Sequence, residues 1–73
     1  MNQKERVLEY VQKHGFITGR IAVDELDIMD VSKRIGELEK LGYRFDHHRH
    51  DYLNRHGEAR HYTIYRLEGS PSA

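Results

Sequence analysis

The sequence has no cysteine and no net charge, and each absence excludes a class of function. Without cysteine the chain can form neither disulfides nor thiolate metal sites, so its composition fits a reducing, cytoplasmic setting. Twelve lysines and arginines balance twelve aspartates and glutamates. A protein that binds nucleic acid by non-specific phosphate neutralisation usually carries a clear basic excess. The zero balance therefore argues against indiscriminate binding of polyanions.

The sequence also lacks the segments and motifs of a membrane protein or an enzyme. No apolar run approaches the roughly 18 residues that a membrane span requires, and the opening "MNQKERVLEY" is too charged for a signal peptide. There is no glycine-rich phosphate loop, and the acidic residues are scattered over expected helix surfaces, where a catalytic base has no orienting partner. At 73 residues the chain is one small domain with little room for a deep pocket. We therefore predict a binding protein with no catalytic activity, no cofactor and no membrane partner.

Hydrophobic periodicity predicts three helices. The segment "QKERVLEYVQKHG" places its apolar residues on one stripe and ends in glycine, which predicts a helix from Gln3 to His14. The next residues, "FIT", form a short extended segment, and Thr18 caps a second helix from Gly19 to Leu26. After a turn of about three residues, Asp30 caps a third helix, whose apolar residues recur at i, i+4, i+7 and i+10 before Gly42. Two helices joined by so short a turn are typical of a helix-turn-helix.

After Gly42 the period changes to two, which predicts a hairpin. Its strands are expected from Tyr43 to Leu53 and from Ala59 to Leu67, with "NRHGE" at the turn and a disordered tail over residues 68–73. The expected fold is α+β, a winged helix-turn-helix-like domain over residues 1–67 in which three helices precede a two-stranded antiparallel wing. The predicted core is Val7, Leu8, Val11, Ile17, Ile21, Leu26, Ile28, Val31, Ile35, Leu38, Leu41, Phe45, Tyr65 and Leu67.

The predicted wing holds five of the six histidines, which raises the question of a metal site. In a strand His48 and His50 share one face while His47 lies on the other, and His56 or His61 approach across the hairpin. However, no cysteine is present, no HExxH or paired CxxC spacing occurs, and Asp46 and Asp51 have arginine neighbours. We predict exposed wing histidines and no metal site.

Four segments resemble the small winged-helix transcription regulators of phages and prophages. They are "QKERVLEYVQKHGFIT" at the start, "AVDELDI" in the second helix and turn, "RIGELEKLGY" in the third helix, and "NRHGE" with "YRL" in the wing. The resemblance covers nearly all of residues 1–67. The chain departs from it at Asp27, where such turns commonly have glycine.

In length and general appearance the chain is similar to the regulators of host RNA polymerase that Xanthomonas phages carry. We predict a monomer in the cytoplasm of a bacterial host, although the sequence itself does not determine the oligomeric state. The similarity implies that the protein binds the large catalytic subunits of bacterial RNA polymerase, inhibits sigma-dependent initiation and acts as an antiterminator. The zero net charge independently favours a protein partner.

The alternative is sequence-specific DNA binding, as by a phage repressor or excision accessory factor. In that mode the third helix enters the major groove and the wing arginines reach phosphates or the minor groove. Against it, residues 30–42 carry no net charge, and Glu37 and Glu39 on the third helix would face phosphate repulsion unless one of them accepts a hydrogen bond from a cytosine amino group. Under either hypothesis the predicted partner-binding residues are Arg49, Tyr52, Arg55 and Arg60 on the wing, with Lys33 and Lys40 on the third helix.

Overall fold

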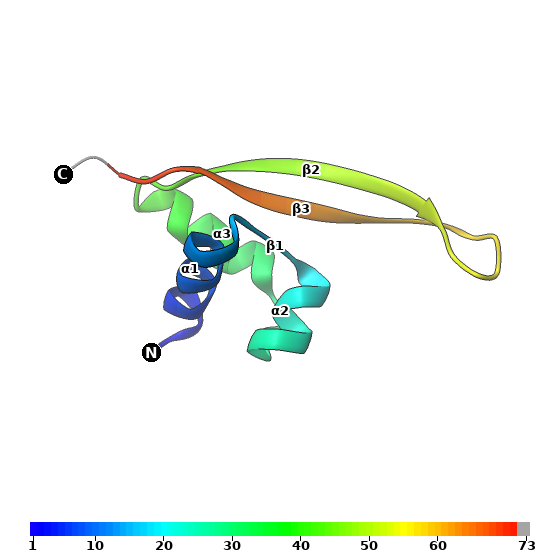
Figure 1. Ribbon diagram of the computed structural model, residues 1–73, viewed down its shortest axis with the longest axis horizontal. Helices are drawn as coiled ribbons and strands as arrows, with labels where there is room; N and C mark the ends of the chain where they lie inside the picture. Colours follow the sequence, from blue (N-terminus) through cyan, green and yellow to red (C-terminus); the bar gives the residue numbers. More distant parts are fainter. Residues whose placement is uncertain (72–73) are drawn as a thin grey trace.

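The structure, a computed structural model, describes residues 1–71 and contains three helices followed by a long hairpin (Figure 1). Its elements are α1 (Gln3–His14), β1 (Phe16–Thr18), α2 (Gly19–Leu26), α3 (Val31–Lys40), β2 (Arg44–Leu53) and β3 (Ala59–Gly69). The winged helix-turn-helix architecture and the bounds of α1 and α2 are as predicted, whereas β2 begins one residue later than expected. The end of β3 was predicted wrongly, because the strand continues past Leu67 to Gly69. The last residues of the predicted tail, Ser72 and Ala73, lie outside the described residues.

Each helix begins at a side chain that caps it locally. Asn2 Oδ1 accepts a hydrogen bond from the backbone N–H of Glu5 at 2.8 Å, and Glu5 Oε1 accepts one from the N–H of Asn2 at 3.2 Å, which completes a capping box. Thr18 and Asp30 accept from backbone N–H groups in the first turns of α2 and α3. The turn between α2 and α3 starts at Asp27, which takes the left-handed conformation at φ 57° in place of the more usual glycine. These local signals position α3 relative to α2.

The hairpin belongs to a three-stranded antiparallel sheet with the order β1-β3-β2. β1 pairs with β3 so that Ile17 lies opposite Tyr65, and β2 pairs with β3 from Phe45 opposite Leu67 to Leu53 opposite Ala59. The sequence predicted a two-stranded wing only, and the pairing of β1 was not foreseen. Since β1 covers only residues 64–66 of β3, the far half of the hairpin has no third strand beside it.

The core lies where α1, α2, α3 and the near half of the sheet meet. It consists of Val7, Val11, Ile17, Ala22, Ile28, Val31, Ile35, Leu38 and Tyr65. The predicted Leu41 is wrong, because its side chain is 54% exposed: a residue at i+10 is rotated by about 80° from residue i on a helix of 3.6 residues per turn. Ala22 is buried although it was left out of the predicted core. Leu8, Ile21, Leu26, Phe45 and Leu67 are partly buried and pack against the core from its edge.

The wing, defined here as residues 44–69, projects beyond the helices and makes the molecule elongated. The principal extents of the molecule are 48 × 22 × 19 Å. Figure 1 shows the far end of the hairpin separated from α1, α2 and α3. Across residues 1–71, no helix combines the length and the apolar character needed to cross a membrane. The fold therefore presents two kinds of exposed surface, the outer face of α3 and the projecting wing.

Candidate functional site

The outer face of α3 carries two exposed lysines on either side of a glycine. Ile35 and Leu38 point into the core, and at about 100° per residue Lys33, Gly36 and Lys40 lie on the opposite face. Lys33 and Lys40 are both exposed. Neither forms an ion pair with any residue in the described part of the chain. This face can therefore offer two uncompensated positive charges to a partner.

Both acidic side chains on α3 have positively charged or protonatable neighbours. Arg34 Nε lies 3.4 Å from Glu37 Oε1, and His47 Nε2 on β2 lies 3.1 Å from Glu39 Oε2. The formal charge is zero only when the cap residue Asp30 is counted with the helix. Glu39 lies at the side of α3, whereas Glu37 borders the outer face, where Arg34 pairs with it.

The contact between His47 and Glu39 also shows which face of the wing lies toward α3. Side chains alternate along a strand, so Arg49 and Asp51 share the face of His47, and Tyr52 lies on the other. His61, opposite Asp51 on β3, lies on the same face as Arg49. The wing therefore presents Arg49 and His61 on the side of α3.

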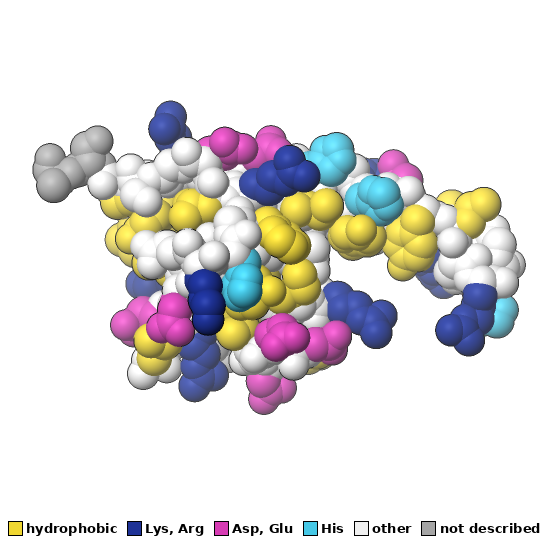
Figure 2. Space-filling view, viewed as in Figure 1, with side chains coloured by type: hydrophobic (Ala, Val, Ile, Leu, Met, Phe, Trp, Pro, Cys, Tyr) yellow, Lys and Arg dark blue, Asp and Glu magenta, His cyan; other side chains and the backbone are white. Residues whose placement is uncertain are grey.

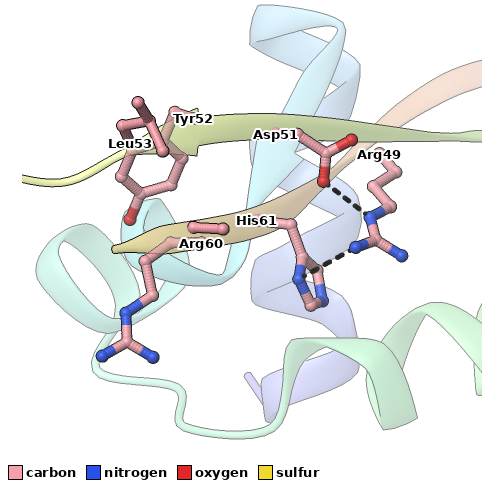
Figure 3. Close-up of a pocket in the computed structure, with 7 residues that line it drawn as sticks. Arg49, Asp51, Tyr52, Leu53, Arg60 and His61 are labelled. Carbon is pink, nitrogen blue, oxygen red and sulfur yellow. Dashed lines mark hydrogen bonds and ion pairs between the residues drawn. The ribbon is translucent and has the colours of Figure 1, made fainter. Parts of the chain in front are cut away.

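The far part of the wing has a shallow hollow that contains three of the predicted residues, Arg49, Tyr52 and Arg60 (Figure 3). Arg49 Nε lies 2.9 Å from Asp51 Oδ1, and Arg49 Nη2 lies 3.4 Å from His61 Nδ1. Arg60 Nη2 lies 3.6 Å from Glu58 Oε1. Exposed ion pairs of this kind contribute at most about 1 kcal/mol. Both arginines can therefore exchange their carboxylates for a stronger anionic partner.

The turn at the end of the wing is organised by Asn54, which the sequence analysis did not single out. Asn54 Oδ1 accepts hydrogen bonds from the backbone N–H groups of His56 at 2.9 Å and Glu58 at 3.0 Å, and Asn54 Nδ2 donates to Glu58 Oε1 at 3.1 Å. Gly57 completes the turn at φ 75°. Arg55, predicted to contact a partner, stands in this turn and has no ion-pair partner among the described residues. The turn thus presents a free guanidinium at the end of the molecule.

A second hollow links α3 to the wing. Its walls come from the start of α2, the turn before α3, the first residues of α3 and the first half of β3. They are Gly19, Arg20, Met29, Asp30, Val31, Ser32, His61, Tyr62, Thr63 and Tyr65. It therefore lies between the two basic surfaces that carry Lys33 and Arg49. The structure does not place Lys33 or Lys40 in one pocket with the wing arginines. Lys33 follows Ser32 of the hollow and Arg49 contacts His61 of the hollow, whereas Lys40 lies at the opposite end of α3.

A groove on the other side of the wing is aromatic. Phe16, Tyr52 and Tyr62 line it together with Thr18, Arg20, Ile21 and Ile64. The three aromatic side chains are 39%, 44% and 41% exposed, and the ring centroids of Tyr52 and Tyr62 are 5.8 Å apart. Figure 2 shows hydrophobic side chains continuing from the helical body along the wing, with a lysine or arginine near its end. The predicted residue Tyr52 therefore faces this groove, away from α3.

The histidines are distributed rather than gathered. His47 contacts Glu39 and the ring of Tyr65, whereas His50 packs against Tyr62. Within residues 1–71, no group of three or more histidine, aspartate or glutamate side chains is arranged to hold a metal ion. His47, His50 and His61 thus have side-chain contacts of other kinds. One of them, from His47, connects the wing to α3.

Comparison with known proteins identifies one family. Residues 2–70 match the family described as "Winged helix-turn-helix domain". Neither a curated protein nor a solved structure shows significant similarity to the chain. The family match spans all three helices and both wing strands, and therefore includes both surfaces described above.

Proposed function

The chain belongs to the winged helix-turn-helix domain family, and from this premise we propose that it is a transcription regulator that binds double-stranded DNA through α3 and the wing. Domains of this kind are regulatory and DNA-binding rather than typical of enzymes. In the proposed complex the outer face of α3 lies in the major groove, and the end of the wing lies on the adjacent backbone or in the minor groove. The setting is the cytoplasm of a bacterial host.

One observation carries this proposal: the acidic side chains of α3 have partners in Arg34 and His47, whereas Lys33 and Lys40 project without ion-pair partners in the described part of the chain. Repulsion between Glu37 or Glu39 and phosphates was an objection to DNA binding. Arg34 reduces the repulsion from Glu37 by its charge, and His47 does the same for Glu39 when its ring is protonated. The surface proposed to meet DNA therefore carries two lysines without ion-pair partners beside carboxylates that already have partners.

Positively charged residues of the wing also support DNA binding. Arg49 and His61 lie on the side of α3, and Arg55 stands at the turn. A hollow lined by Arg20 and Ser32 lies between the start of α3 and the wing. Contacts from α3 would specify the bases, and contacts from the wing would fix the orientation of the protein on the duplex.

The proposal is tested by titrating labelled duplexes, enriched by the wild-type protein from a pool with a randomised central window, at several salt concentrations. Lys33→Glu and Arg55→Glu should each weaken binding by about tenfold or more and reduce the slope of log affinity against log salt. Arg6→Glu is the matched control, since it makes the same change of charge at an exposed position of α1. If all three variants bind the duplex equally, α3 and the wing are not the DNA-binding surfaces.

A second candidate function is binding to bacterial RNA polymerase through its large catalytic subunits, with inhibition of sigma-dependent initiation and antitermination. The observation that favours it is the exposed aromatic groove of Phe16, Tyr52 and Tyr62, because tyrosine and arginine are enriched among the residues that dominate protein interfaces. The zero net charge also suits a protein partner.

Purified core polymerase distinguishes the two functions. If polymerase is the partner, Tyr52→Ala and Tyr62→Ala should lower its affinity, and Lys33→Glu should have little effect. The reverse pattern, with polymerase unbound and duplex binding lost in Lys33→Glu, supports DNA binding. Saturating the protein with duplex before adding polymerase shows whether the two surfaces work independently.

A further inference from the structure

Gly36 has no explanation within the chain itself. It lies in the interior of α3, where glycine lowers helix stability relative to alanine. A β-carbon built at residue 36 would meet no atom within 4 Å, and the backbone does not adopt a positive φ there. Alanine would therefore fit and would stabilise the helix. Nothing in the described fold therefore requires glycine at this position.

Four other glycines have a structural reason within the fold for lacking a side chain. A β-carbon at residue 42 would lie 2.9 Å from Cβ of Pro71, and one at residue 69 would lie 2.7 Å from Nη2 of Arg44. Gly15 and Gly57 have positive φ angles of 89° and 75° at a helix end and at the wing turn. Gly36 has neither a close neighbour nor a special backbone conformation.

We infer that Gly36 is the point of closest approach between α3 and its ligand, and that this ligand is the major-groove edge of double-stranded DNA. Gly36 lies three residues after Lys33 and four before Lys40, so along the helix axis it lies between the two unpaired lysines and adjoins both on the outer face. Without a side chain at residue 36, the helix backbone can approach the base-pair edges while both lysines reach phosphates on either side. The charge of this face selects an anionic ligand over an apolar protein helix, which would also accept a bare glycine.

This inference deepens the proposed function and rests on it. Gly36 makes no directional contact of its own, so its role is to determine specificity by shape. A methyl group at residue 36 would hold α3 away from the groove floor by part of an ångström or more. Contacts to bases would lengthen, whereas the phosphate contacts of the flexible lysine side chains would adjust.

The experiment compares Gly36→Ala and Gly36→Leu with wild type on the enriched duplex and on a mixed-sequence duplex. Gly36→Ala should raise the thermal midpoint of unfolding by several degrees, because helix propensity improves and no atom is displaced. Its affinity for the enriched duplex should fall by about tenfold, with the mixed-sequence duplex affected less and the salt slope unchanged. Gly36→Leu should show a larger loss. Gln12→Ala, at an exposed position of α1, is the control for a change in helix propensity alone.

The outcomes separate this inference from the proposed function. If wild type binds no duplex, the proposed function fails, and the inference fails with it. If wild type binds and Gly36→Ala binds as tightly, the inference alone is overturned. If Gly36→Ala retains duplex binding but loses core polymerase, Gly36 faces a protein partner and the assignment to DNA is overturned. Greater thermal stability together with weaker, less sequence-selective duplex binding supports the inference.

Discussion

The substitution Asn54→Ala tests whether the end of the wing is preorganised for binding. Asn54 joins four groups of the turn, since its Oδ1 accepts from two backbone N–H groups and its Nδ2 donates to Glu58, while its own backbone N–H donates to the carbonyl of Glu58 at 3.0 Å. Alanine retains only the two backbone bonds of residue 54, the second of which runs from the N–H of Gly57 to the carbonyl of residue 54 at 3.0 Å. The charge of the wing is unchanged, so any effect on binding comes from the conformation of the turn that carries Arg55.

The size of the effect follows from where these bonds lie. A hydrogen bond of this type contributes about 0.5–1.5 kcal/mol, and water can replace part of it in an exposed turn. The wing end has no third strand beside it, so the loss should fall mainly on the local opening of the turn rather than on global unfolding. We expect the thermal midpoint to change little and the duplex affinity to fall by about 1–2 kcal/mol, or roughly 5- to 30-fold.

Fluorescence anisotropy with the enriched duplex at several salt concentrations measures this directly. Asn54→Ala should weaken binding by the same factor at every salt concentration, because no charge is removed. Arg55→Ala is the comparison, and it should reduce the salt slope by about 0.9 if its guanidinium neutralises one phosphate. Wild-type affinity in Asn54→Ala, measured on protein with an intact circular dichroism spectrum, would refute the idea that the turn is held ready for DNA.

Three further expectations concern the fold and the histidines. Leu38 is 1% exposed, so Leu38→Ala should lower the free energy of unfolding by about 2–5 kcal/mol in urea titrations, and an unchanged stability would mean that α3 does not bury its apolar stripe. Burial raises the pKa of the Tyr65 phenol above 10.0; the hydrogen bond with Thr63 opposes this shift, and the charges of Asp30 and Glu39 add to it. Folding therefore favours the protonated phenol, so this contribution to stability is complete below about pH 10 and is lost as the pH rises through the folded pKa. Between about pH 9 and 11, the urea midpoint of unfolding should therefore fall less in Tyr65→Phe than in wild type. Protein purified without a histidine tag should contain no stoichiometric zinc, and a chelator that lowers its melting temperature would contradict that expectation.

The helices were predictable because their signals are local. Thr18 and Asp30 cap the helices that directly follow them, so a reading of adjacent residues was sufficient. The pairing of β1 with β3 depends on Ile17 meeting Tyr65, far away in the sequence, and three extended residues carry too little pattern to specify a partner. The prediction that Leu41 belongs to the core was wrong for a different reason. The apolar repeat continues to the end of α3, but the helix face on which Leu41 lies is rotated away from the core.

The candidate site was predictable as a set of charges but not as an arrangement. Lys33, Lys40 and the wing arginines could be named from residue type and element. Counting charges along α3 could not show that Glu39 contacts His47, because His47 lies on β2 and the contact depends on how β2 packs beside the helix. The role of Asn54 had a possible signal in "NRHGE", where asparagine begins a turn that ends near glycine and can bond to its own backbone. The proposed role of Gly36 could not be inferred from the sequence, because only the structure shows that a β-carbon there would meet no atom within 4 Å.

Because β2 and β3 pair residue by residue, the length of the wing can change only in steps of one residue pair. Each added pair of residues in β2 and β3 would lengthen the hairpin by about 3.3 Å, close to the 3.4 Å rise of one base pair. One added pair would also turn the distal side chains to the opposite face, whereas two added pairs would restore their facing and move the turn by about two base pairs. Under the proposed function, the residue pairs between Phe45 and Leu53 set the distance between the DNA contacts of α3 and of the wing turn. Adding or removing two pairs would then change that distance by about two base pairs without any change in α3.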